Sequence, residues 1–126
     1  MKVYLTARFA RRDEMTTYVE DLKRLGHQVT SRWLGVEFDP LTPLSNPRWS
    51  ELAQQDVDDI RKADALICFT ETSGGGGARH VELGIGLGLG KRVYIVGNAE
   101  HLFHTLTHLE VYPDWVALLR SIKAEL

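Results

Sequence analysis

The stretch "DALICFTETSGGGGARHVELGIGLGLGKRVYIVG" (residues 64–97) decides the fold that we predict. Residues 64–70 form a continuous apolar run, which is typical of a strand buried on both faces of a sheet, and residues 92–97 form a second apolar strand. The glycines at 84, 86, 88 and 90 alternate with apolar residues, so a strand is a rival interpretation there. Parallel neighbours need a crossover between them, however, and we therefore interpret residues 78–90 as a helix.

The rest of the chain repeats this alternation of strands and helices. We predict strands at 2–6, 28–33 and 109–113, helices at 11–26, 48–63 and 114–126, and a short helix or turn at 99–106. Residues 34–47 hold three of the four prolines and are predicted to be a loop. Asp114 is the expected N-cap of the last helix. The pattern predicts an α/β protein whose parallel sheet is covered on both faces.

Three glycines inside the predicted helix, Gly84, Gly86 and Gly88, need a compensating reason. Each costs a helix roughly 1 kcal/mol relative to alanine, and close packing on the sheet is the expected reason. The glycines match neither the G-x-G-x-x-G pattern nor the G-K-[ST] pattern of phosphate-binding loops, because Arg92 follows Lys91. We therefore expect no dinucleotide cofactor, although the loop at 74–77 allows a ligand to approach the backbone closely.

Composition indicates an ordinary globular domain. The chain has 126 residues, a net charge of −2 and 44% hydrophobic residues, so we predict one domain over 1–126 and no nucleic-acid polymer or membrane as partner. Cys68 is its single cysteine. A disulfide framework is excluded within one chain, and a reducing cytoplasm fits best. We see neither a signal peptide at the N-terminus nor an apolar run long enough to span a membrane.

Two carboxylates stand out at the edge of the sheet where ligands bind in such folds. Glu82 is the one acidic residue in the glycine-rich stretch and lies near the start of its helix, whose dipole favours the ionised form. It is either a surface glutamate or a nucleophile aimed into a cleft. Asp56 belongs to an acidic run that is usually solvated, yet it shares a helical face with Ile60 and Ala63, which contact the sheet.

Cations gather where the first strand meets the first helix. Thr6, Arg8 and Arg11 are either a solvated helix start or a phosphate site, which His80 could join. Histidines at 101, 104 and 108 could share a helical face, but the segment is short and no matching carboxylate is apparent, so we predict no metal.

Three segments carry a resemblance to a known family: "KVYLTARF" (2–9), "AQQDVDDIRKADALICF" (53–69) and "HVELGIGLGLGKRVYIVG" (80–97). They resemble the nucleoside 2-deoxyribosyltransferases and the related nucleoside 5′-monophosphate N-glycosidases. The resemblance implies a flavodoxin-like (Rossmann-like) three-layer fold with a five-stranded, mainly parallel sheet. It also implies cleavage of the N-glycosidic bond of a nucleoside or its 5′-monophosphate, with transfer of the sugar to another base or to water.

The resemblance assigns roles to three residues. Glu82 matches the nucleophile that attacks C1′ and holds the sugar as a covalent ester. Asp56 matches the aspartate that positions the sugar or moves a proton at the base, and Tyr4 matches the tyrosine that contacts the nucleophile or sugar. An ionised carboxylate suits a transition state with oxocarbenium character, as in retaining glycosidases. Tyr4 as a plain core residue remains the alternative.

The sequence also departs from the family. Gly76 occupies the position of the transferases' base-binding aspartate, and Ser73 lies near the phosphate-binding serine of the hydrolases without aligning with it. Gly77 and His80 complete the expected substrate-binding loop. The resemblance further implies a homodimer or larger homo-oligomer in which His104 reaches a neighbour's site. A small-molecule nucleoside or nucleotide is the expected partner, and a non-catalytic nucleotide sensor is the alternative function.

Overall fold

The computed structural model describes residues 1–37, 39, 41–70 and 77–125. Its strands are β1 (Lys2–Thr6), β2 (Gln28–Val29), β3 (Ala65–Phe69), β4 (Arg92–Val96) and β5 (Glu110–Tyr112). Its α-helices are α1 (Arg12–Arg24), α2 (Arg48–Lys62), α3 (Ala78–Gly88) and α4 (Trp115–Ala124). Three short 3-10 helices complete it: η1 (Phe9–Arg11), η2 (Arg32–Gly35) and η3 (Leu102–Thr105).

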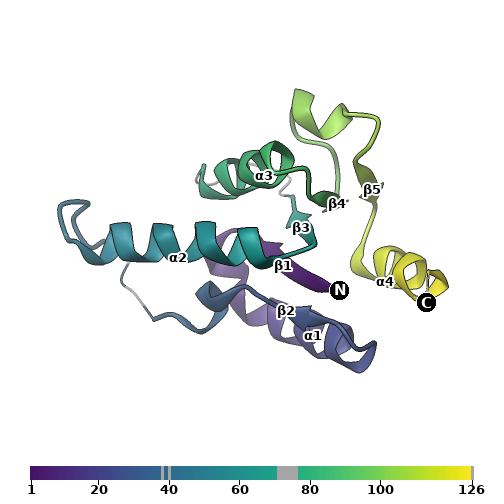
Figure 1. The fold of residues 1–126 in the computed structure, drawn as a ribbon, viewed down its shortest axis with the longest axis horizontal. Helices are drawn as coiled ribbons and strands as arrows, with labels where there is room; N and C mark the ends of the chain where they lie inside the picture. Colours follow the sequence, from purple (N-terminus) through teal and green to yellow (C-terminus); the bar gives the residue numbers. More distant parts are fainter. Residues whose placement is uncertain (38, 40, 71–76, 126) are drawn as a thin grey trace.

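The five strands form one sheet in the order β2-β1-β3-β4-β5, and every pairing is parallel. This is the doubly wound, flavodoxin-like order, so the predicted fold class is confirmed. Helices α2 and α3 cover one face, and α1 and α4 cover the other (Figure 1). Asp56 in α2 and Glu82 in α3 therefore belong to helices on the same face of the sheet.

The glycine-rich stretch is helical, as predicted, but close packing on the sheet explains only one of the three glycines for which it was predicted. A Cβ at Gly86 would lie 2.6 Å from a methyl carbon of Leu66, so this glycine lets α3 pack closely on β3. At Gly84 and Gly88 a Cβ would meet no atom within 4 Å. The prediction of close packing is therefore wrong for Gly84 and Gly88, which face open space.

The second strand ends earlier than predicted, because tertiary contacts bend the chain. The expected strand at 28–33 pairs only over Gln28–Val29, and η2 begins at Arg32. Asp59, buried in α2, accepts hydrogen bonds from the Arg32 backbone N–H and from its Nε. The Trp33 indole donates to the Leu5 carbonyl at 2.8 Å. These bonds replace the pairing that a longer strand would make.

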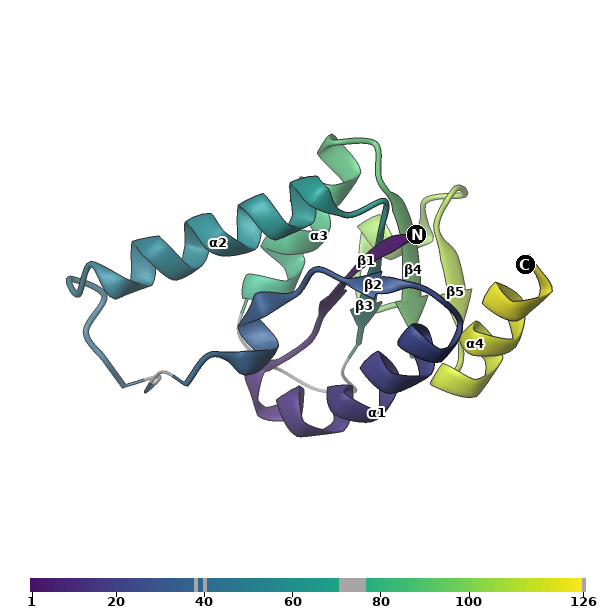
Figure 2. The same ribbon diagram turned by 60° about the horizontal axis from the view of Figure 1, so that its bottom comes forward.

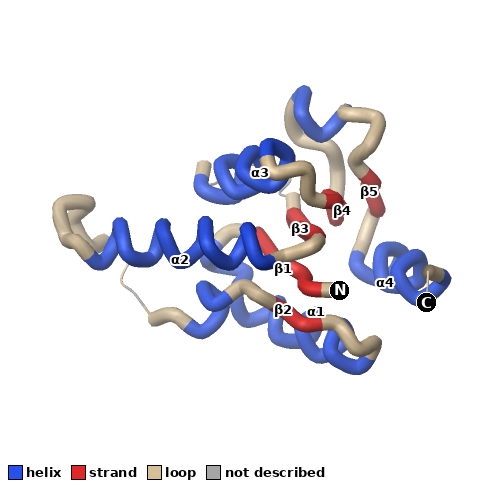
Figure 3. Tube along the Cα trace, in the orientation of Figure 1, coloured by secondary structure: helices blue, strands red, loops and turns tan. Residues whose placement is uncertain are grey.

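The N-terminal ends of α4 and α2 have different surroundings. The Asp114 carboxylate accepts a hydrogen bond from the Ala117 N–H at 2.9 Å, which confirms the predicted N-cap of α4. The first half of α2 and the loop before it extend beyond the sheet in both orientations (Figure 2), and Figure 3 shows that loop as irregular backbone. None of the helices in the described ranges has the length and apolarity that crossing a membrane requires.

Candidate active site

Asp56 and Glu82 line the same cavity, which has a volume of about 330 Å³. Asp56 comes from the middle of α2, and Glu82 comes from the second turn of α3. Ile60 and Ala63 follow Asp56 on one helical face and are buried against the sheet, which orients that face as predicted. Two carboxylates that are 26 positions apart in sequence thus meet beside the carboxyl end of β1.

Hydroxyl groups from β1 lie beneath this pair. Tyr4 and Thr6 occupy alternate positions of the strand, so both side chains point to the face covered by α2 and α3. Both are fully buried, and their hydroxyls are near enough to Glu82 to stabilise its ionised form. Within the described part of the chain, no hydrogen bond of good geometry satisfies either hydroxyl oxygen or Glu82 Oε2, although the hydroxyls lie close enough to lower the pKa of Glu82. Buried polar atoms without partners are costly, so this cluster is suited to a polar ligand that supplies the missing bonds.

Burial shapes the ionisation of both carboxyl groups. It raises the pKa of Glu82 to about 7, with a further contribution from the charge of Asp56 and opposition from the two hydroxyls. Burial and the charge of Asp59 raise the pKa of Asp56 to about 6. Desolvation thus opposes the ionisation that the helix N-terminus favours, and Glu82 lies beyond the first turn, where the effect of the dipole is largest.

The same surroundings keep Tyr4 protonated. Burial raises the pKa of its phenol far above the usual value, and the carboxylates Glu82 and Asp56 raise it further. A phenol that retains its proton beside two carboxyl groups acts as a hydrogen-bond donor. Tyr4 is part of the buried core, and its predicted contact with the nucleophile or sugar stays a prediction.

The other acidic residues of α2 have different surroundings. Asp59 is buried and forms an ion pair with Arg32 at 2.8 Å, which anchors η2 to α2. Asp58 accepts a hydrogen bond from the Gln54 amide at 2.9 Å. The three aspartates of the acidic run thus differ: Asp56 lines the cavity, Asp58 contacts its own helix, and Asp59 holds η2. The structural role of Asp59 was missed because its partner Arg32 lies 27 positions away in sequence.

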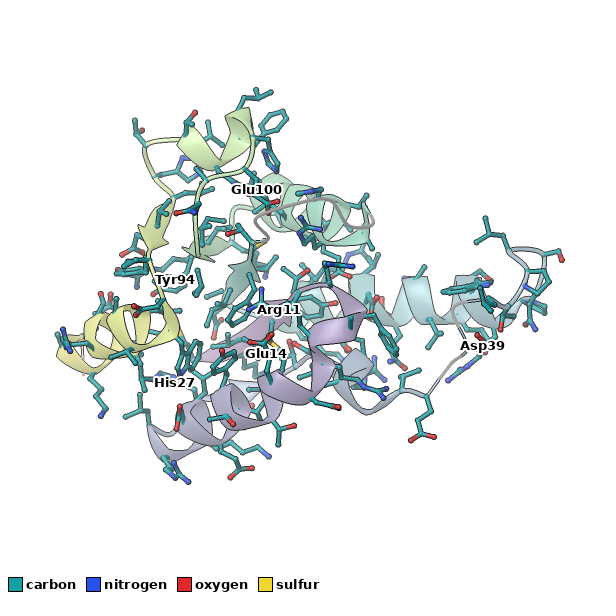
Figure 4. All side chains as sticks on the ribbon, turned by 180° about the vertical axis from the view of Figure 1, so that it is seen from behind. Arg11, Glu14, His27, Asp39, Tyr94 and Glu100 are labelled. Carbon is teal, nitrogen blue, oxygen red and sulfur yellow. The ribbon has the colours of Figure 1, made fainter. Side chains whose placement is uncertain are left out.

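The basic residues after β1 are partly committed to structural contacts. Arg11 forms an ion pair with Glu14 and donates to the Thr70 carbonyl at 3.2 Å (Figure 4). Arg12 donates to the Val36 carbonyl. Arg8 is exposed and directly precedes η1. Arg11 thus has a structural role in addition to any contact with a ligand, and the predicted contacts of Thr6, Arg8 and Arg11 with a phosphate stay predictions.

His80 and His104, predicted to bind substrate, lie together, and neither is among the described residues that line the cavity of Asp56 and Glu82. His80 Nδ1 is 3.1 Å from His101 Nε2, and the rings of His101 and His104 are 3.8 Å apart between centroids. His80 and His101 line a second cavity. Next to them, the Arg79 guanidinium forms a buried ion pair with Glu100 at 2.8 Å, which attaches the segment after β4 to α3.

One nitrogen of each of these three histidines lies within 4.8 Å of the others, which is the arrangement of a possible metal site. Their hydrogen bonds oppose that use. His104 Nδ1 accepts from the Glu100 N–H, and His101 Nδ1 accepts from the Phe103 N–H. The Nδ1 atoms that accept these hydrogen bonds cannot bind a metal at the same time. Burial lowers the pKa of His80 and His104, and we interpret the cluster as a group of hydrogen-bonded histidines.

The remaining predicted residues belong to the loop before α3. Ser73 and Gly76 lie outside the described residues. Gly77 is the N-cap of α3, and its carbonyl accepts from the N–H groups of His80 and Val81. The predicted contacts of Ser73, Gly76 and Gly77 with substrate stay predictions.

Sequence reasoning missed the apolar lining of the cavity. Trp33 and Phe9 line it from the segments after β2 and β1, and Trp49, Leu52 and Ala53 line it from α2. The α2 residues could have been found, because they share one helical face with Asp56 at spacings of three, four and seven positions. The cavity therefore has a polar end at the carboxylates and apolar walls elsewhere along its described lining.

No protein-family model and no curated protein matches this chain at a significant level. Solved structures do match. One is a CMP N-glycosidase of Clostridium botulinum, with a TM-score of 0.68 and 18% identity over 98% of this chain and 99% of that one. Another is a 2-deoxyribosyltransferase of Bacillus psychrosaccharolyticus, with a TM-score of 0.76 and 22% identity over 94% of this chain and 90% of that one. The chain thus has the fold of the family that its sequence resembles.

Proposed function

We propose that this protein cleaves the N-glycosidic bond of a nucleoside or its 5′-monophosphate through a covalent glycosyl ester on Glu82. The observation that carries the proposal is the convergence of Glu82 and Asp56 at one end of a single cavity, with the buried Tyr4 hydroxyl beside both carboxyl groups. Two solved structures with this fold are named as a CMP N-glycosidase and a 2-deoxyribosyltransferase, which supports this class of chemistry.

In the first step the Glu82 carboxylate attacks C1′ and the C1′–N bond breaks. The electron pair of the broken C1′–N bond stays on the base nitrogen, and this nitrogen takes a proton from the Asp56 carboxyl group. In the second step an incoming base or water attacks C1′ and gives its proton to the Asp56 carboxylate, while Glu82 leaves as a carboxylate. This sequence follows the two-carboxylate logic of retaining glycosidases.

The raised pKa values allow a bound substrate to set the protonation of the pair. Burial raises the pKa of Glu82 to about 7 and that of Asp56 to about 6, so the two carboxyl groups share protons near neutral pH in the free site. Glu82 Oε2 lacks a hydrogen-bond partner among the described residues. A sugar hydroxyl that donates to Oε2 would lower the pKa of Glu82. The proton would then move to Asp56, where the leaving base needs it.

A single assay tests the proposal. The protein is incubated with 2′-deoxynucleosides, ribonucleosides and their 5′-monophosphates, with and without a free acceptor base, and released and exchanged bases are separated by chromatography. Release without an acceptor indicates a hydrolase, and exchange that requires an acceptor indicates a transferase. Binding without turnover would overturn the proposal in favour of a nucleotide sensor. The expected homo-oligomer and the cytoplasmic location stay predictions.

A further inference from the structure

The active-site cavity continues from Asp56 along α2 as an apolar surface. Trp49, Leu52, Ala53 and Asp56 line it from one helical face. Seven positions of an α-helix span about 10 Å along its axis, so the cavity reaches well beyond the carboxyl group. This extension lies in the half of α2 that projects past the sheet (Figure 2).

Two tryptophan rings in the lining are held by hydrogen bonds made elsewhere. The Trp33 indole N–H donates to the Leu5 carbonyl at 2.8 Å, and the Trp49 indole N–H donates to the Thr42 carbonyl at 2.9 Å. Both polar edges are thus engaged with backbone, and the rings offer carbon surface to the cavity. Phe9 adds a third ring, 6.4 Å from that of Trp33 between centroids. Together the rings make a rigid apolar wall.

The order of groups along the cavity shows which part of a bound substrate the apolar wall would face. The proposed function places C1′ at Glu82 and the leaving base at Asp56. Ala53, Leu52 and Trp49 precede Asp56 in α2, in the half that projects past the sheet, whereas α3, which carries Glu82, lies beside the other half of α2 (Figures 1 and 2). The wall therefore faces the edge of the base that is remote from the glycosidic nitrogen. Of the ten described residues that line the cavity, Asp56 and Glu82 alone have polar side chains able to ionise, and no amide or hydroxyl side chain is among them.

We propose that this apolar wall is a subsite for a nucleobase that carries an apolar substituent on the edge remote from the sugar. The remote edge of an unmodified base bears carbonyl, amine or ring nitrogen groups, which lose their hydrogen bonds to water against carbon surface. An alkyl or aromatic substituent at that edge instead buries apolar area and stacks on the rings. The inference rests on the proposed function, since that function sets the direction of the base.

Binding of free bases tests the subsite without requiring turnover. Adenine, N6-propyladenine and N6-benzyladenine are titrated into the wild-type protein by calorimetry, in the presence of saturating 2-deoxyribose. We expect the benzyl compound to bind at least about 10-fold more tightly than adenine, as for other groups that fill a hydrophobic pocket. Equal or weaker binding of the substituted bases would overturn the subsite.

Two variants connect the preference to the wall. Trp49→Ala removes a ring, and Ala53→Leu fills the space beside Asp56, so each should reduce the benzyl-to-adenine affinity ratio by at least about threefold. Gln54→Leu adds a similar side chain on a neighbouring position that does not line this cavity, and the ratio should stay at its wild-type value. A ratio that is unchanged in both test variants would contradict the assignment. Failure of the proposed enzyme activity appears separately, as absence of base release from every nucleoside.

Discussion

Successive residues of β1 point to opposite faces of the sheet, and the two faces are built differently. Val3 and Leu5 pack with α1 and α4 in an apolar cluster. There Tyr18 stacks on Phe69 and on Trp115, with centroid distances of 5.1 and 4.5 Å. Tyr4 and Thr6 face α2 and α3 instead, where buried hydroxyl and carboxyl oxygens lack hydrogen-bond partners among the described residues.

This difference indicates that the two faces contribute differently to stability and to ligand binding. The first face, with α1 and α4, contributes stability through close packing of large side chains. The second face, with α2 and α3, retains polar groups whose desolvation opposes folding and whose bonds a substrate can complete. Substitutions on the two faces should therefore have opposite consequences for activity and stability.

The largest effect is expected from Glu82→Gln, which removes the nucleophile. Turnover should fall by at least about 1,000-fold, as for other enzymes that lose a nucleophile, while substrate binding persists. Initial rates of base release measure the loss, and calorimetric titration of substrate measures the binding. Wild-type rates in this variant would contradict the covalent mechanism.

The same variant should not lose stability. The pKa of Glu82 is raised in the folded protein, so its contribution to stability is present at low pH and is lost as pH rises toward 7. At pH 8, Glu82→Gln should therefore raise the free energy of unfolding by roughly 1–3 kcal/mol, and at pH 4 it should change little. Urea denaturation at the two pH values measures the difference. Equal changes at both would show that desolvation of the carboxylate is not the cause.

On the opposite face, Trp115→Ala should primarily reduce stability. The ring is buried against Tyr18 and Phe69, and its indole N–H donates to Asp21 at 2.9 Å. Removing it should cost about 3–5 kcal/mol of unfolding free energy, measured by urea denaturation. Val116→Ala, an exposed neighbour, should change stability by less than about 0.5 kcal/mol. A small loss for Trp115→Ala would mean that the aromatic cluster is not the main source of stability.

Asp56→Asn tests the acid–base role within the second face. An amide has no proton to give the leaving base, so the rate should fall by about 100-fold. The wild-type plot of kcat/KM against pH should peak between about 6 and 7, because Glu82 loses its charge on the acid side and Asp56 loses its proton on the alkaline side. The alkaline limb should disappear in the variant. Asp58→Asn, a control outside the cavity lining, should stay within about twofold of wild type; equal effects would indicate a response to net charge alone.

Arg8→Ala tests whether the turn after β1 binds a 5′-phosphate. A charge-assisted contact contributes roughly 1.5–3 kcal/mol, so affinity for monophosphates should fall about 10- to 150-fold while affinity for nucleosides is retained. Lys23→Ala removes one positive charge from the far end of α1 and should affect neither class. If Arg8→Ala weakens both classes equally, the turn does not recognise phosphate.

The main elements of the fold and the two carboxylates could be predicted because they depend on local pattern. Apolar runs and helical spacing define β3, α3 and β4, and the topology then brings Asp56 and Glu82 to one edge. The early end of β2 could not be predicted, because it depends on the distant contact between Arg32 and Asp59. The raised pKa of Glu82 was missed for a similar reason: burial by neighbours outweighs the position of a residue in its own helix.

The smallest expected effect concerns two glycines of α3 that the sequence pattern treats as equivalent. Gly84→Ala adds a methyl group in open space and replaces a poor helix former, so it should raise stability by up to about 1 kcal/mol. Gly86→Ala places a methyl group 2.6 Å from the buried Leu66 side chain. Overpacking of this kind costs about 1–3 kcal/mol, which offsets or exceeds the gain in helix propensity. The midpoint temperature of thermal unfolding should thus rise for Gly84→Ala and be lower for Gly86→Ala than for Gly84→Ala. Equal stabilisation of both variants would show that α3 can move away from β3, and the close approach of helix and sheet at Gly86 would then not be what holds Glu82 over Tyr4.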